Sequence, residues 1–300
     1  MRVGADPHEV CEVDHTGSRT IEPTGVPGEP PEAGTLRVVR KHRLDTLLAQ
    51  RGLFDTRTRA AAAVLAGDVR VGERPARKPG ELVADDAELV IRAAPPYVSR
   101  GGVKLANALD AFGLDPAGRR ALDVGASTGG FTDCLLGRGA DAVTTLDVAY
   151  GELHWRLRQD ERVTVIERTN ARSLGAGVLP WAPDLIVIDV SFISLAKVLP
   201  AVVAQAAPAF DCLALVKPQF EVGRGRVGKG GVVHDADERR AALVAVGAFA
   251  RDELGVAVLD FASSGLPGPA GNRESFVWLA ESGRDGAVDD VAAASRRAEP

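Results

Sequence analysis

The hydrophobic positions of residues 101–280 alternate between two patterns. Apolar runs of strand length lie at residues 121–124, 142–148, 163–166, 184–190, 211–220, 256–261 and 275–280. Between several of them, as in residues 101–112 and 235–254, apolar residues recur three and four positions apart, which is typical of one face of a helix. Strands that alternate with helices form an open, mostly parallel sheet. The sequence therefore predicts a doubly wound, seven-stranded α/β fold that binds its ligands at the carboxyl ends of the strands.

A smaller α+β domain is predicted ahead of this sheet. RLDTLLAQRGL (residues 43–53) places Leu44, Leu47 and Leu48 on one helical face. TRTRAAAAVLAG (residues 56–67) has the pattern of a second helix, which ends at a glycine. We expect short strands at residues 69–71 and 89–91.

The composition predicts the limits of these parts. Residues 1–36 are rich in Pro, Gly, Glu and Thr and have no apolar periodicity, so we expect a disordered leader. The small domain spans residues 37–92. Residues 93–100 contain two consecutive prolines and are predicted to form a stiff linker. The larger domain spans residues 101–282, and residues 283–300 are expected to be a flexible tail.

The charge is distributed unevenly along the chain. The net charge is −5, yet residues 37–104 carry 14 basic and 8 acidic side chains. A local basic segment in an acidic chain indicates that this segment binds the phosphate backbone of a nucleic acid. The acidic remainder argues against indiscriminate nucleic-acid binding. The alternative is an ordinary solvated helix face. The candidate RNA contacts are Arg43, Arg51, Arg57, Arg59 and Arg70.

Membrane, disulfide and metal chemistry find no support in the sequence. No apolar run approaches the length of a membrane span, and the N-terminus lacks a signal pattern. The three cysteines, Cys11, Cys134 and Cys212, lie far apart, so we expect reduced thiols and a cytoplasmic protein. The five histidines show no ligand spacing, and we predict no metal site.

A glycine turn lies between the first strand of the large domain and its helix. Its glycines follow a G-x-x-x-G-G spacing, unlike the G-x-G-x-x-G of a dinucleotide site. Such a turn suits a carboxylate, and Asp147, 22 residues after the first glycine, ends the next strand, where it can accept ribose hydroxyls. S-adenosylmethionine carries a carboxylate, a ribose and an adenine in this order. The alternative is a tight connection only. The candidate cofactor residues are Gly125, Ser127, Thr128, Gly129, Gly130 and Asp147.

Four charged residues fall at the functional edge of the predicted sheet. Asp189 and Lys217 end strands, Lys104 precedes the first strand, and Glu274 opens the last. In a doubly wound sheet these positions converge on one crevice. Each residue alone is equally explained by a surface salt bridge.

A further motif, GRGRVGKG (residues 223–230), differs by one residue from a phosphate-binding P-loop. Gly230 replaces the hydroxyl residue that would hold Mg²⁺, and the next helix begins too late. We interpret the segment as a mobile basic lid.

Two families are recognisable in these motifs. Residues 37–92 resemble an S4 RNA-binding domain, with Thr56-Arg57 in place of the usual Ser-Arg and Gly72-Glu73 in place of Asn-Gly. VSRGGVKL, DVGASTGGFTD, IDVSFISL, LVKPQFEVG and GNRESF resemble the FtsJ-like 2′-O-ribose methyltransferases. Together, over residues 37–280, they resemble the TlyA family, whose members are called haemolysins and act as ribosomal RNA (cytidine-2′-O)-methyltransferases.

The resemblance implies a Rossmann-like methyltransferase sheet, S-adenosylmethionine as cofactor, and 16S or 23S ribosomal RNA, or both, or the ribosomal subunits, as partner. It also implies that Asn170 lies near the adenine. The chemistry agrees, because a ribose hydroxyl needs alignment with an already activated methyl group and the loss of one proton, without a metal. We expect Lys217 to be the base or hydroxyl activator, Asp189 to orient it, and Lys104 and Glu274 to position the reactants.

Two other functions are considered. A ribosome-binding protein with an inactive methyltransferase fold would keep the S4 arginines and lose the four charged residues, which are intact here. A haemolysin would need a membrane-length apolar stretch or a strongly amphipathic basic one, and the sequence has neither. We expect a monomer.

Overall fold

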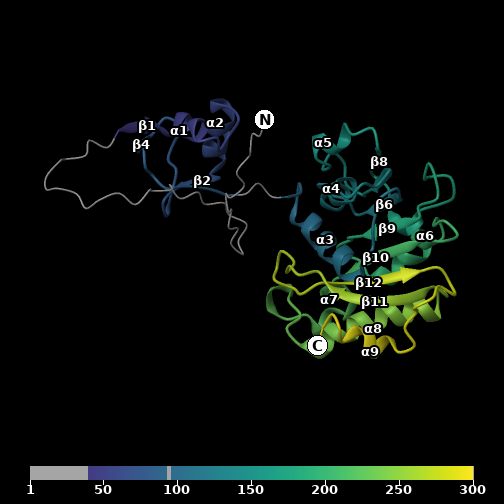
Figure 1. Cartoon of the computed structure of the whole chain (residues 1–300). Coiled ribbons are helices and arrows are strands. Elements are labelled where there is room, and N and C mark those ends of the chain that lie inside the picture. The colour runs from purple at the N-terminus through teal and green to yellow at the C-terminus, as the bar shows by residue number, and fades with distance from the viewer. Residues whose placement is uncertain (1–39, 93–95, 300) are drawn as a thin grey trace, which may run out of the picture. The chain divides into compact units, whose positions relative to one another are not determined.

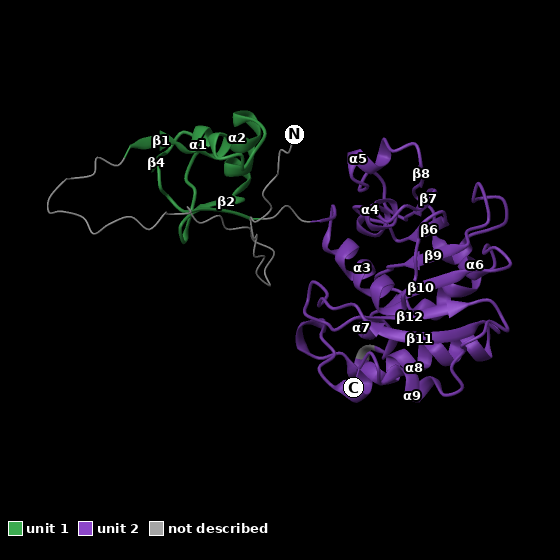
Figure 2. Ribbon diagram, viewed as in Figure 1, with its two compact units in different colours: residues 1–94 green, residues 95–300 purple. Residues whose placement is uncertain are grey.

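The computed structural model describes residues 40–92 and 96–299 (Figure 1). The chain divides into two compact units, residues 1–94 and residues 95–300 (Figure 2). The division lies within the linker that the sequence predicts. The expected leader, residues 1–36, and Cys11 lie outside the described residues.

The first unit contains two helices and short antiparallel strands. Helices α1 (Leu44–Gln50) and α2 (Arg57–Ala66) pack together, and α2 begins at Thr56, whose hydroxyl accepts a hydrogen bond from the Arg59 N–H at 3.2 Å. Strand β1 (Lys41–Arg43) pairs with β4 (Leu82–Ala84), and β2 (Val69–Val71) lies between β3 (Arg74–Pro75) and β5 (Leu89–Ile91). The predicted helices and two of the strands are confirmed. Strands β1, β3 and β4 were not predicted, because two or three residues carry little periodicity.

The second unit contains the predicted seven-stranded sheet. Its strands are β6 (Arg120–Val124), β7 (Ala142–Leu146), β8 (Val163–Ile166), β9 (Leu185–Ile188), β10 (Asp211–Val216), β11 (Ala257–Ser263) and β12 (Ser275–Ala280). They follow the order β11-β12-β10-β9-β6-β7-β8 (Figure 2). Strands β8, β7, β6, β9 and β10 are parallel, and β12 is antiparallel to both of its neighbours. The doubly wound, mostly parallel sheet is confirmed.

Alternate residues of the central strands enter two cores on opposite faces of the sheet. Leu185, Val187 and Leu213 pack with helices α3 (Arg100–Phe112) and α4 (Gly130–Gly137). Ile186 and Ile188 enter the other core, with helices α6 (Leu199–Val203), α8 (Ala236–Asp252) and α9 (Val291–Ser295). These strands are apolar on both faces, which is typical of buried parallel strands. Cys134 and Cys212 are buried as free thiols, one in each core.

Two segments differ from expectation. The segment SFISLAKVL (residues 191–199) predicts a helix directly after the strand that ends near Asp189. Instead the chain first makes a loop, and the 3₁₀ turn η2 (Leu195–Lys197) precedes α6. The sequence also predicts a flexible tail over residues 283–300, whereas the structure packs α9 against α8 and β11. Val291 and Ala294 enter a core, and Glu299 lies 2.5 Å from Arg239. Alanines at helical spacing bury little area, so this segment gives only a weak sequence signal.

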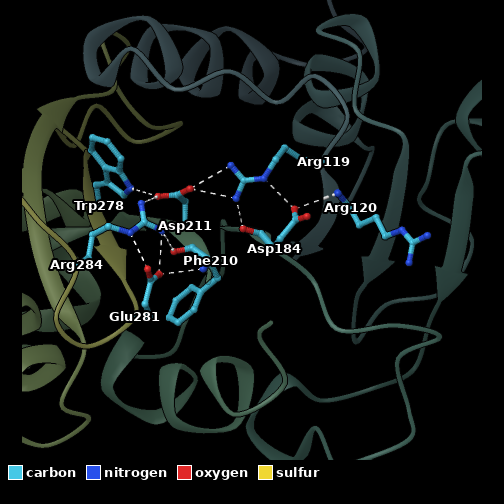
Figure 3. A network of polar contacts seen from close by, with 8 residues as sticks. All are labelled: Arg119, Arg120, Asp184, Phe210, Asp211, Trp278, Glu281 and Arg284. Carbon is cyan, nitrogen blue, oxygen red and sulfur yellow. Dashed lines mark hydrogen bonds and ion pairs between the residues drawn. The ribbon is translucent and has the colours of Figure 1, made fainter. Parts of the chain in front are cut away.

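A polar network joins the amino ends of the parallel strands (Figure 3). Arg119 contacts Asp184 at 2.9 Å and Asp211 at 3.0 Å, and Arg284 contacts Asp211 at 3.2 Å. The hydrogen bond from Arg284 lowers the pKa of Glu281 to about 2. This network lies at the opposite ends of the strands from Gly125, Asp189 and Lys217, so its role is to join the strands rather than to bind a ligand at the carboxyl edge.

Candidate active site

The turn after β6 has no room for side chains at its glycines. Gly125 has a φ of +83°, and a Cβ there would lie 2.5 Å from the carbonyl oxygen of Asp189. Gly129 has a φ of +92°, and a Cβ there would lie 2.3 Å from Leu157. A left-handed conformation combined with such close neighbours requires glycine. Steric crowding within the fold therefore explains the glycine spacing. The same crowding is expected if the turn is only a tight connection between strand and helix.

Asp147 directly follows β7 and faces this turn. Its Oδ2 accepts a hydrogen bond from the Ser127 N–H at 2.8 Å, and its Oδ1 accepts one from the Ala149 N–H at 2.8 Å. The carboxylate thus ties the end of β7 to the glycine turn. This is the position that the 22-residue spacing predicts.

The four predicted catalytic residues line one cavity of about 610 Å³. This volume is within the range of small-molecule sites, roughly 300–1,000 Å³. Gly125, Ser127, Thr128 and Gly130 line the same cavity. The structure therefore brings the charged residues and most of the turn together. Their roles stay predictions.

The charged residues form two ion pairs inside the cavity. Lys104 Nζ lies 2.5 Å from Glu274 Oε2, with both side chains buried. Lys217 Nζ lies 2.5 Å from Asp189 Oδ1 and donates a hydrogen bond to Ser191 Oγ at 2.9 Å. An ammonium group has three donors, so the Lys217 amine retains one N–H beyond these two partners.

Asp123 is a cavity residue that the sequence analysis missed. It lies in β6 and is 0% exposed. Its Oδ2 accepts hydrogen bonds from the Thr132 N–H (3.0 Å) and Oγ1 (2.7 Å), whereas its Oδ1 has no hydrogen-bond partner among the described residues. Burial raises the pKa of Asp123 to about 7. The available signal was an acidic residue within a run that is otherwise apolar.

Two aromatic residues were also missed. Phe192 is 92% exposed, has a φ of +63° and lies with its ring centroid 5.3 Å from that of Phe220. Both line the cavity. An exposed phenyl ring beside charged groups offers a flat apolar surface at a polar site.

Comparisons with known proteins identify both domains of the chain. A model of the S4 domain matches residues 42–89, and a model of the FtsJ-like methyltransferases matches residues 97–281. The 16S/23S rRNA (cytidine-2′-O)-methyltransferase TlyA of Mycobacterium tuberculosis is 50% identical over 244 residues, 81% of this chain and 91% of that protein. The chain belongs to the TlyA family.

Proteins named for haemolysis are similar to the chain as well. Hemolysin A of Brachyspira hyodysenteriae is 39% identical over 194 residues, 64% of this chain and 81% of that protein. A solved structure described as a "putative hemolysin" from Streptococcus thermophilus has a TM-score of 0.64 and 37% identity, and the match covers 86% of this chain and 96% of that one. Within residues 40–92 and 96–299, no helix has the length and apolar character that a membrane span requires.

Asn170 lies apart from the cavity of this TlyA-family domain. Its side chain accepts a hydrogen bond from the Arg172 N–H at 3.0 Å, and with Arg172, Ser173 and Lys197 it lines a separate hollow. The P-loop-like segment forms two 3₁₀ turns, η3 (Arg224–Arg226) and η4 (Lys229–Gly231), well before α8 begins. It does not connect a strand directly to a helix, as a P-loop does.

All five predicted RNA-binding arginines of the S4 domain have partners within their own unit. Arg43 and Arg57 contact the carboxylate of buried Asp45 at 2.8 and 3.1 Å. Their hydrogen bonds, that of Arg43 first, hold the pKa of Asp45 well below its usual range. Arg59 pairs with Asp55 at 2.6 Å, and Arg51 and Arg70 donate to backbone carbonyls. Arg43 and Arg57 therefore have a structural function whether or not they contact RNA.

Proposed function

We propose that this chain transfers a methyl group from S-adenosylmethionine to the ribose 2′-hydroxyl of a cytidine in 16S or 23S ribosomal RNA, or in both. The observation that carries the proposal is the convergence of two lysine–carboxylate pairs in one cavity beside the glycine turn. The name of the Mycobacterium tuberculosis relative supports the choice of cytidine and of ribosomal RNA.

The residues of the cavity fit the cofactor. The turn at Gly125 leaves backbone N–H groups of the α4 start near the cavity, which suits a carboxylate. The unpartnered Oδ1 of Asp123 suits a cationic amino group. We infer that residues 125–130 hold the amino-acid part in the cavity. We further infer that Asp147, beside the turn, accepts the ribose hydroxyls, and that the adenine extends out of the cavity toward Asn170. The cofactor supplies a methyl group that is already activated for transfer.

The chain's own residues then align the ribose and handle one proton. The remaining N–H of Lys217 is directed by Asp189 and Ser191, so it can hold a 2′-hydroxyl at a fixed position. In its neutral form the same amine accepts the hydroxyl proton, and in its charged form it stabilises the developing oxyanion. Lys104 and Glu274 line the same cavity. The exposed ring of Phe192 provides a surface on which an unstacked base can lie.

The decisive experiment measures methylation directly. Mass spectrometry of ribosomal RNA from cells with and without the gene should show one or more 2′-O-methylcytidines that depend on it. Purified chain with S-adenosylmethionine and isolated subunits should restore the mark. Subunit binding without methyl transfer would support the inactive-fold alternative, and lysis of erythrocytes by the purified chain would support the haemolysin alternative. From the proposed ribosomal substrate we infer that the chain acts in the cytoplasm, and we propose that it acts as a monomer.

Cofactor binding should depend on pH through Asp123. Its folded pKa of about 7 lies above the ordinary value near 3.9, because burial favours the neutral form. Without ligand, this group therefore stabilises the folded state at low pH and loses that effect as pH rises through 7. A cationic amino group beside Oδ1 favours the carboxylate, so affinity for S-adenosylmethionine should rise between pH 5.5 and about 7.

Calorimetry at pH 6 in buffers of different ionisation enthalpy should detect proton release on binding. Asp123→Asn should abolish both the release and the rise in affinity. An affinity that is flat over this range in the unmodified chain would contradict the role given to Asp123.

Substitution of Arg57 should change the stability of the S4 domain, whereas substitution of Arg59 should change RNA affinity. Arg57→Glu places a carboxylate against buried Asp45, so we expect it to lower the melting temperature of the first unit. Arg59→Glu breaks only an exposed pair and should leave stability nearly unchanged. If Arg59 contacts a phosphate, RNA affinity falls and the salt slope of binding drops by about one. Titrations at several salt concentrations, with cofactor affinity as the control, test this. Unchanged RNA affinity would remove Arg59 from the interface.

A further inference from the structure

The loop between β9 and η2 contributes several side chains to the cavity, although it has little regular secondary structure. Asp189, Ser191 and Phe192 all lie in this loop, and Phe192 has a left-handed backbone. The opposing segment is Lys217 with the short helix α7 (Pro218–Glu221) at the end of β10. The geometry of the Lys217–Asp189 pair therefore depends on how firmly these two segments are joined.

Glu221 joins them at the far end of α7. Its Oε2 accepts a hydrogen bond from Ser194 Oγ at 2.6 Å, and its Oε1 accepts one from the Leu195 N–H at 2.9 Å. Ser194 also accepts a hydrogen bond from the Ala196 N–H at 3.2 Å, which begins η2. Burial raises the pKa of Glu221, as for a carboxyl group that the fold encloses. Leu195 and Val222, on either side of this contact, are anchored in the same core.

Three contacts thus connect the two segments along their length. The Lys217 amine binds Asp189 and Ser191 at the cavity, the Phe192 and Phe220 rings pack in the middle, and Glu221 closes the far side. Catalytic groups need support of this kind, because a displacement of about 1 Å can lower a rate about 100-fold.

We propose that Glu221 is a positioning residue for methyl transfer: its carboxylate holds the loop of residues 189–194 against α7 and so fixes the Lys217–Asp189–Ser191 arrangement. Glu221 is not among the described residues that line the cavity, and its carboxylate accepts hydrogen bonds from Ser194 and Leu195. The inference rests on the proposed methyl transfer. It adds to that proposal a residue that acts only through others.

The test compares Glu221→Ala with Glu281→Ala. Glu281 is a matched control, because its carboxylate also accepts one backbone N–H, that of Phe210 at 2.9 Å, and one side-chain partner, Arg284, in the network at the other edge of the sheet (Figure 3). Both variants should lower the melting temperature. Only Glu221→Ala should lower kcat, by about 10- to 100-fold. Its affinity for S-adenosylmethionine and its KM for ribosomal subunits should stay within about twofold.

Two further variants separate positioning from simple loss of stability. Glu221→Gln retains an acceptor for Leu195 and a donor for Ser194, so it should keep kcat within about threefold of the unmodified chain. Ser194→Ala should lower kcat less than Glu221→Ala, because it leaves the Leu195–Glu221 hydrogen bond in place. The double variant should be no worse than Glu221→Ala alone, since both substitutions remove the same Ser194–Glu221 hydrogen bond. The pH profile of kcat should shift in Glu221→Ala and not in Glu281→Ala.

The outcomes distinguish this inference from the proposed function. If the unmodified chain transfers no methyl group, the proposed function fails. If it does, and Glu221→Ala has normal kcat or loses no more than Glu281→Ala, the positioning role is overturned while the function stands. Should Glu221→Ala fail to fold, Ser194→Ala against the same control decides the question, and an unchanged kcat there overturns the role.

Discussion

Lys217→Met is expected to abolish methyl transfer and to leave both cofactor and RNA binding nearly intact. The substitution keeps the unbranched stem of the side chain, with sulfur in place of one methylene, in a position that is 9% exposed, and it removes the amine. That amine is the group that Asp189 and Ser191 orient toward the cavity. Its contribution arises in the transition state, so kcat should fall while ground-state binding persists. Single-turnover methylation of ribosomal subunits measures the rate of transfer, and calorimetry measures cofactor binding.

The companion variant Lys217→Arg distinguishes a base from a fixed charge. Arginine retains the positive charge but is not deprotonated in proteins at ordinary pH. If Lys217 removes the hydroxyl proton, Lys217→Arg should be as inactive as Lys217→Met. An active Lys217→Arg enzyme would show that charge alone suffices here and that the base lies elsewhere. If Lys217→Met itself retained full activity, the assignment of the amine would be wrong.

The parts of this structure that could be predicted are those with a strong local signal. The central strands are apolar runs because they are buried on both faces. Positions 125 and 129 are glycines because the turn is left-handed there and has close neighbours. The convergence of Asp189 and Lys217 followed from topology, because the carboxyl ends of parallel strands share one edge.

The missed features depend on contacts between distant segments. In Asp123 one carboxylate oxygen has no hydrogen-bond partner within residues 40–92 and 96–299, and no sequence spacing reveals this. The role of Glu221 depends on its contact with Ser194, which lies 27 residues earlier in the chain. Arg57 looks like a free surface cation in the sequence, and only the fold places buried Asp45 beside it. Such pairings are set by tertiary packing and leave no periodic trace.

Asp147→Ala is expected to weaken S-adenosylmethionine binding by about 1–3 kcal/mol, the size of losing hydrogen bonds to a charged acceptor. This corresponds to roughly a 5- to 150-fold rise in Kd. The carboxylate also receives the N–H groups of Ser127 and Ala149, so its removal loosens the turn as well as deleting the ribose acceptor. Asp147→Asn keeps one acceptor oxygen, so its Kd for S-adenosylmethionine should lie between those of the unmodified chain and Asp147→Ala. At saturating cofactor, kcat should recover, because the loss is one of ground-state binding.

Asp141→Ala is the matched control for this variant. Asp141 is exposed and lies next to the amino end of the same strand, β7, whereas Asp147 lies next to its carboxyl end. Because ligands bind at the carboxyl ends of a doubly wound sheet, only the Asp147 variant should change calorimetric cofactor affinity. RNA affinity should be unchanged in both. If Asp147→Ala bound the cofactor as tightly as Asp141→Ala, the carboxylate would serve only to hold the turn, and Gly125 and Gly129 would be what the simpler interpretation makes them, a tight connection between a strand and a helix.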